Sequence, residues 1–110
     1  MNYSLRFAPE LEEDLYAGFV WYEVKSKGLG NEFLNVFYDN VDRLAKNPLI
    51  YAKVYLDFHR SLLRQFPFSC YYRIEGNRVV VYGVFHSARN PAFITTSLNT
   101  RDGRFGFSPT

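Results

Sequence analysis

The apolar run VVVYGVF at residues 79–85 constrains the fold more than any other stretch of the sequence. A β-strand points successive side chains to opposite faces of its sheet, and in this run both alternating sets are apolar. The sets are Val79, Val81 and Phe85 on one side and Val80, Tyr82 and Val84 on the other. Because a strand that is buried on both faces belongs inside a sheet, we expect residues 78–85 to form a central strand. His86 and Arg89 then lie just beyond its carboxyl end.

The first half of the chain predicts one strand followed by two helices. Residues 3–7 alternate apolar and polar side chains, which is the period of a strand. Residues 9–27 place apolar side chains every three or four positions, with acidic residues in the first turn, and Gly28 suits the end of a helix. A second apolar stripe covers residues 33–44 and is stopped by Pro48. The short link predicts an antiparallel helical hairpin.

The second half predicts an antiparallel sheet. Three strand-like runs lie at residues 59–66, 69–75 and 78–85. Gly76 and Asn77 form a short turn between the last two runs, whereas residues 51–57 have the pattern of a loop. The predicted class is α+β: an N-terminal strand, a helical hairpin and three antiparallel strands, with the helices on one face of a four-stranded sheet. We expect one domain at residues 1–93 and a C-terminal tail, flexible or bound to a partner, at residues 94–110.

Composition excludes several classes of protein. The chain has 110 residues and a single cysteine, Cys70, which cannot form an intrachain disulfide or a thiolate metal site. Two histidines without clustered carboxylates give no metal site either. The apolar stretches are far shorter than the roughly 20 residues of a membrane helix. We expect a soluble, cytoplasmic protein without a cofactor.

The arginines suggest a binding face. Nine arginines stand against four lysines, and a guanidinium group matches the geometry of phosphates and carboxylates. If the helices cover the side of Tyr72, then Tyr71 and Arg73 point to the opposite, open side of the sheet. Arg64 and Arg89 are expected on the same side, which would make the open face basic and aromatic, suited to a phosphate backbone or an acidic protein.

Five segments in this order resemble a known family. They are the pair Trp21–Tyr22, GLGNEFLNVF at 28–37, the pair Asn47–Pro48, FPFSCYYRIE at 66–75 and VVVYGVFHSARNP at 79–91. Together they resemble the RelE/ParE superfamily of toxins from bacterial type II toxin–antitoxin systems, often labelled plasmid stabilisation proteins. The resemblance covers about residues 3–93.

The resemblance implies a toxin that is held inactive by an antitoxin from the same operon, and no small-molecule substrate. RelE-like members cut mRNA on the ribosome, whereas ParE-like members poison DNA gyrase. Candidate antitoxin-binding residues are the aromatic side chains Tyr38, Phe105 and Phe107.

An endoribonuclease needs a general base, a general acid and positive charge at the phosphate. The catalytic candidates are Arg60, Arg64, Arg73, His86 and Arg89, with His59 as a further titratable group. RelE-like members usually carry lysines in the strand at 59–66 and a tyrosine near the chain end, where this chain has arginines and Phe93. Arginine stays protonated and is a poor base.

The ParE-like alternative is therefore favoured. It needs only a complementary surface, for which the candidate target-binding residues are Arg64, Tyr71, Arg73, His86 and Arg89. The mRNA endoribonuclease and a degenerate, non-toxic family member remain the alternatives. Purely structural roles also stay open: His86 would then cap the last strand by bonding a backbone carbonyl, Arg89 would pair with Glu75 or Asp57, and Trp21 would seal the helices against the sheet.

Overall fold

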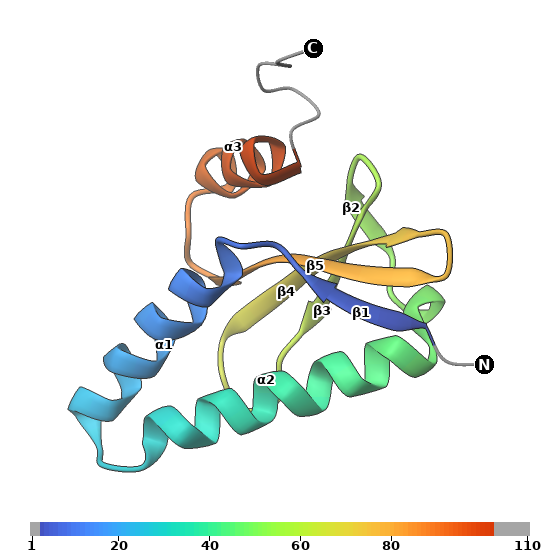
Figure 1. Cartoon of the computed structure of the whole chain (residues 1–110). Helices are drawn as coiled ribbons and strands as arrows, with labels where there is room; N and C mark the ends of the chain where they lie inside the picture. The colour runs from blue at the N-terminus through green and yellow to red at the C-terminus, as the bar shows by residue number, and fades with distance from the viewer. Residues whose placement is uncertain (1–2, 103–110) are drawn as a thin grey trace.

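The computed structural model describes residues 3–102 and shows a sheet with helices on both faces (Figure 1). The elements are β1 (Ser4–Phe7), α1 (Leu11–Lys25), α2 (Leu29–Lys46), the 3-10 turn η1 (Pro48–Ile50), β2 (Lys53–Tyr55), β3 (Phe58–Leu62), β4 (Phe68–Glu75), β5 (Arg78–His86) and α3 (Pro91–Asp102). The five strands lie in the order β1-β5-β4-β3-β2. β1 is parallel to β5, and the other neighbours are antiparallel, so the α+β class is confirmed.

Strand β5 is the buried interior strand that its sequence predicts, flanked by β1 and β4. However, the alternation of its side chains between the two faces of the sheet is interrupted. Tyr72 of β4 pairs with Val81 and Tyr71 pairs with Gly83, so Tyr82 is an extra residue on β5. Such a bulge shifts the side-chain phase by one residue. Beyond it, Val84 joins Val79 and Val81 in the helix-side core and Phe85 joins the opposite cluster, contrary to the alternation expected from the sequence.

The predicted helical hairpin packs on one face of the sheet (Figure 1). α1 is shorter than expected, beginning at Leu11 and ending at Lys25. Gly28 adopts a φ of 90° between the helices, a conformation that favours glycine. On α2, Phe33 and Phe37 are fully buried against the sheet, as the apolar stripe predicts.

A third helix covers the opposite face, which the sequence analysis expected to be open (Figure 1). The expected domain boundary at residue 93 falls inside α3, and residues 94–102 are helical. Leu98 of α3 is fully buried in a cluster of aromatic residues from the sheet. The sheet members of this cluster are Phe58, Tyr71, Tyr82 and Phe85. The expectation of a bare basic face is therefore wrong, since an ordered helix lies over it.

The sheet also has one strand more than expected. Residues 53–55, within the predicted loop, form the edge strand β2 and pair with β3 across a two-residue turn. Leu56 in this turn has a φ of 50°. β3 ends at Leu62 rather than at residue 66, and Gln65 has a φ of 71° in the connection to β4. Within residues 3–102, no helix is both long enough and apolar enough to cross a membrane.

The close packing of α1 on α2 gives a first test. A Cβ added at Gly18 would lie 2.6 Å from the ring of Phe33. That ring is fully buried and packed edge-on against Phe66, so it has no room to move. We expect Gly18→Ala to lower the free energy of unfolding by about 1–3 kcal/mol, although alanine is the better helix former. Urea denaturation measures the change.

The neighbouring exposed position provides the control. Ala17→Gly should cost only about 1 kcal/mol, the difference in helix propensity. An unfolding free energy of Gly18→Ala that exceeds that of the wild type would contradict the packing described for this hairpin.

Candidate functional site

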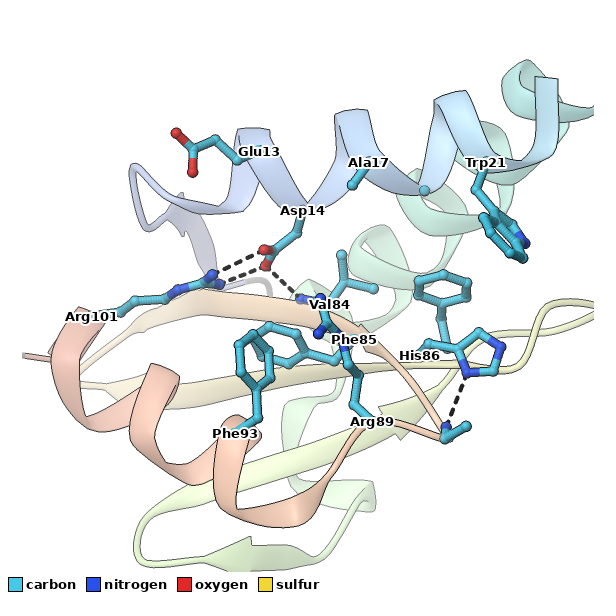
Figure 2. Close-up of a pocket in the computed structure, with 13 residues that line it drawn as sticks. Glu13, Asp14, Ala17, Trp21, Val84, Phe85, His86, Arg89, Phe93 and Arg101 are labelled. Atoms are coloured by element: carbon cyan, nitrogen blue, oxygen red, sulfur yellow. Dashed lines mark hydrogen bonds and ion pairs between the residues drawn. The ribbon is translucent and has the colours of Figure 1, made fainter. Parts of the chain in front are cut away.

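A groove of about 690 Å³ lies between α1, the carboxyl end of β5 and α3 (Figure 2). Its position follows from the central strand, because the chain leaves the sheet there in a turn and then enters α3. Two backbone hydrogen bonds fix this turn: Ser87 N–H donates to the Pro67 carbonyl at 2.7 Å and Arg89 N–H to the His86 carbonyl at 3.0 Å. This turn forms one rim of the groove.

Aromatic rings form much of the groove. Phe68 and Phe85 line it, and Phe93 of α3 packs edge-on against Phe85. Trp21 of α1 lines the same groove with 57% of its surface exposed, and Lys25 Nζ lies 4.3 Å from the centre of its ring. The expectation that Trp21 seals the helices against the sheet is therefore wrong. An exposed tryptophan in a concave site is a typical contact for a protein partner.

His86 and Arg89 meet at this groove, as their sequence spacing suggests (Figure 2). The Nδ1 atom of His86 accepts a hydrogen bond from Ala88 N–H at 3.0 Å, rather than donating to a carbonyl as a strand cap would. A neutral His86 thus carries its proton on Nε2. The guanidinium of Arg89 stacks over the ring of Phe93, 4.2 Å from the ring centre.

The two carboxylates considered as ion-pair partners of Arg89, those of Glu75 and Asp57, lie beside other basic side chains. Glu75 binds Arg73 and Arg78, and Asp57 lies 4.0 Å from Lys53. Arg89 therefore presents its charge at the groove, in cation–π contact with Phe93.

A buried ion pair closes the other end of the groove (Figure 2). Asp14 of α1 accepts two hydrogen bonds from Arg101 of α3, at 2.5 and 2.9 Å, and one from Val84 N–H of β5 at 3.2 Å. Arg101 also donates to the Tyr82 carbonyl at 3.0 Å. A Cβ at Gly83 would lie 2.6 Å from the Phe85 ring and 2.9 Å from Arg101 Nη1, so a larger residue there would displace one or both of these side chains.

No local sequence pattern identifies Asp14 or Arg101 as residues of the groove. A glycine inside an otherwise apolar strand is the one local signal of such a close approach. The pair depends on residues 87 positions apart, which no local pattern connects.

The remaining predicted site residues do not gather with His86 and Arg89. Arg64 lies 3.7 Å from Asp39 of α2. Arg73 lies beneath α3, within 2.7 Å of Glu75 and 2.6 Å of Asp102. The expectation that Arg64, Arg73 and Arg89 share one face is wrong, because α3 and α2 supply carboxylates that bind two of them.

Three further candidates also lie outside the groove. Arg60 is exposed on β3, while Tyr71 beside it is buried in the cluster under α3. His59 is buried, stacked on Tyr72, with Nδ1 2.7 Å from the Tyr51 carbonyl.

Of the antitoxin-binding candidates, Phe105 and Phe107 lie outside the described residues. Tyr38 is half-exposed and, with Phe7, lines a smaller groove of about 280 Å³ between β1 and the helical hairpin.

Arg73 is unavailable to a ligand because carboxylates beneath and on α3 already compensate its charge. Its neighbour Glu75 also accepts a hydrogen bond from the Tyr82 hydroxyl at 2.8 Å. Burial alone would raise the pKa of Glu75, but the hydrogen bonds from Tyr82 and Arg73 and the nearby guanidinium charges outweigh it and hold the pKa below its usual value. Burial and the same hydrogen bond raise the pKa of Tyr82 to about 12.

The arrangement is therefore suited to binding. The larger groove is open and aromatic and presents a guanidinium and an imidazole. Such a surface suits an apolar or acidic segment of a macromolecule. The described residues contain no group of three or more histidines, cysteines or carboxylates placed to hold a metal ion.

Comparisons with known proteins agree with this fold. Residues 5–91 match the family model described as the ParE toxin of the type II toxin–antitoxin system parDE. The chromosomal ParDE system of P. aeruginosa is structurally similar at 18% identity, with a TM-score of 0.69 over 76% of this chain and 95% of that one. A mutant E. coli RelE toxin in the free state is similar at 13% identity, with a TM-score of 0.62 over 96% and 99%.

A third similar structure is the RelBE2 toxin–antitoxin complex of Mycobacterium tuberculosis, at 19% identity and a TM-score of 0.58 over 78% of this chain and 99% of that one. No curated protein matches the sequence significantly.

The buried pair Asp14–Arg101 gives a second test. Asp14→Asn removes the charge while it keeps the shape, and leaves the Arg101 guanidinium buried without its counter-charge. We expect a loss of about 3 kcal/mol in unfolding free energy and faster hydrogen exchange of the α3 amides. Glu13→Gln, the same change at the exposed neighbouring residue, should stay within about 0.5 kcal/mol of the wild type. Equal effects of the two substitutions would mean that the pair does not hold α3.

Glu75 gives a test by pH. Its folded-state pKa is lowered, so it contributes stability above the ordinary pKa of glutamate, about 4.3, and this contribution is lost as the pH falls through the folded value. Urea unfolding between pH 7 and 3 should therefore show an acid loss of stability that is smaller in Glu75→Gln. The exposed control Glu12→Gln should keep the full loss, and identical profiles for both variants would contradict the assignment.

Proposed function

Because the chain belongs to the ParE toxin family of type II toxin–antitoxin systems, we propose that a cognate antitoxin holds it inactive and that the free protein binds and poisons DNA gyrase. The site of target contact is the groove that contains Trp21, His86 and Arg89. Such a toxin acts in the cytoplasm, where its target is found.

The separation of the arginines is the observation that supports a gyrase-type target over RNA cleavage. Transfer of a ribose 2′-hydroxyl to phosphorus needs a base, an acid and cations around one phosphate. Arg64 and Arg73 face carboxylates on other parts of the molecule and do not line the groove with His86. Contact with a protein target requires complementary shape and a few anchors, and tryptophan and arginine supply such anchors most often.

An antitoxin partner is supported by two of the structural neighbours, which are toxin–antitoxin systems. The smaller groove at Tyr38 and Phe7 is a suitable place for it, because it adjoins β1, a strand at the edge of the sheet. A partner can bind such an edge by adding a strand while its apolar side chains fill the groove. This arrangement leaves Trp21 and Arg89 free for the target.

Arg89 gives the test of this function. Expression of the wild-type chain in a bacterium without the antitoxin should arrest growth, and the purified chain should inhibit DNA supercoiling by gyrase. Arg89→Ala should reduce both effects at least tenfold with an unchanged melting temperature, since an exposed side chain contributes little to stability. Arg43→Ala, which removes an exposed arginine from α2, is the matched control and should retain both effects.

Other results would point to the alternatives. New cuts within codons of cellular mRNA, found by primer extension while supercoiling is unaffected, would replace gyrase with ribosome-bound mRNA as the target. Normal growth after induction of the folded wild-type chain would indicate a family member without toxicity.

A further inference from the structure

The side chain of His86 closes the turn that carries Arg89 (Figure 2). Its Nδ1 atom accepts a hydrogen bond from the backbone N–H of Ala88, two residues further along the chain. Asparagine and aspartate close the same kind of turn with Oδ1, which is bonded to Cγ just as Nδ1 is in histidine. The imidazole therefore acts as the side chain of an Asx turn, but unlike asparagine it can be protonated.

Protonation of His86 removes this hydrogen bond. The bond needs the lone pair of a neutral Nδ1, whereas both ring nitrogens of the charged imidazole are donors. The Nδ1–H then faces the Ala88 N–H, donor against donor, across the 3.0 Å that now separate the two nitrogens. The ring or the turn has to move to separate them. Histidine side chains ordinarily change their charge between about pH 5 and 8, so the change takes place under mild conditions.

The surroundings of His86 offer no ion pair that would hold the charged ring in place. The other charged residues that line the groove are Glu13, Asp14, Arg89 and Arg101. Asp14 and Arg101 bind each other, and Glu13 lies with them at the end of the groove away from His86 (Figure 2). The neighbouring strand β4 places the apolar ring of Phe68 edge-on against the imidazole. Within residues 3–102, His86 forms no ion pair.

The position of Arg89 depends on this turn. Its N–H donates to the carbonyl of His86, the residue whose ring has to move, and the Ser87 N–H donates to the Pro67 carbonyl. The guanidinium of Arg89 lies 4.2 Å from the centre of the Phe93 ring at the start of α3. A cation–π contact weakens as the cation leaves the ring face. A shift of the turn therefore separates the guanidinium from the ring.

We propose that neutral His86 is a positioning residue, whose Nδ1 holds the turn in which Arg89 stacks on Phe93, and that protonation releases both the turn and the guanidinium. The consequence for binding rests on the proposed function, because Arg89 is the anchor offered to the target. Binding of the target is then about fivefold weaker at mildly acidic pH than at neutral pH, the equivalent of one net hydrogen bond.

NMR spectroscopy of the isotope-labelled full-length chain tests the positioning without any target. At about pH 8 the wild type should show a scalar coupling across the hydrogen bond between Ala88 N and His86 Nδ1. It should also show nuclear Overhauser contacts between the side chain of Arg89 and the ring of Phe93. Both signals should be lost at about pH 5.5, where histidine is largely protonated.

Two substitutions separate the roles of the two ring nitrogens. His86→Asn keeps an acceptor at the position of Nδ1 that does not titrate, so the contacts between Arg89 and Phe93 should be present at both pH values. His86→Gln carries its amide near the position of Nε2 and leaves the Ala88 N–H without this acceptor, so the contacts should be weak at both. The two variants are matched, since both replace the ring by a neutral amide.

Binding to immobilised DNA gyrase tests the consequence. His86→Asn should bind about fivefold more tightly than His86→Gln at both pH values. The ratio of the wild-type affinity to the affinity of His86→Asn should fall about fivefold between the higher and the lower pH. This ratio cancels the titration of gyrase and of His59, which are the same in both measurements.

Contacts between Arg89 and Phe93 that persist in the wild type at the lower pH, or that are equal in the two variants, would overturn the proposal. Gyrase binding that His86→Gln retains and His86→Asn loses would also overturn it, because Nε2 would then contact the target directly. A ratio that stays constant with pH would contradict the consequence for binding. The expected NMR changes in a chain that binds no gyrase at either pH would contradict the proposed target and support the role of His86.

Discussion

Strand β5 has two apolar faces, and both must be covered for the chain to fold. The helical hairpin of α1 and α2 covers one face, and α3 covers the other. Because β5 lies between these two layers, its carboxyl end lies between α1 and α3. The turn at residues 87–90 and the groove beside it are consequences of this arrangement, since the chain must leave a buried strand and return as a covering helix.

Helix α3 is held by both apolar contacts and ion pairs. Leu98 is its one fully buried apolar side chain, but the consecutive residues Arg101 and Asp102 bind Asp14 of α1 and Arg73 of β4. Buried ion pairs add little net stability compared with hydrophobic packing in the same place. They form, however, only when the two side chains meet at a defined distance and orientation. The two pairs therefore fix the position of α3, and with it the place of Phe93 and Arg101 in the wall of the groove.

The elements that the sequence predicts are those whose signals are local. The stripe on α2, the Gly76–Asn77 turn and the apolar run of β5 each follow from a short repeat or a turn dipeptide. Helix α3 was missed because it has no apolar stripe and depends on ion pairs with distant residues. The same reason separates the site residues: His86 and Arg89 are neighbours in the sequence and were found, whereas Trp21, Asp14 and Arg101 reach the groove only through tertiary packing.

The same covering helix also decides which charges the protein can offer to a partner. RelE and ParE toxins share this fold, so the fold alone does not distinguish cleavage of RNA from binding of a protein target. Without α3, Arg73 would stand on an open sheet face, as the sequence suggests. With α3 in place, Asp102 and Glu75 compensate the charge of Arg73, and the groove presents Arg89 and His86 among aromatic rings. A groove with few cations and many aromatic rings favours contact with a protein surface. Cleavage of RNA would instead require several positive charges gathered around the reacting phosphate.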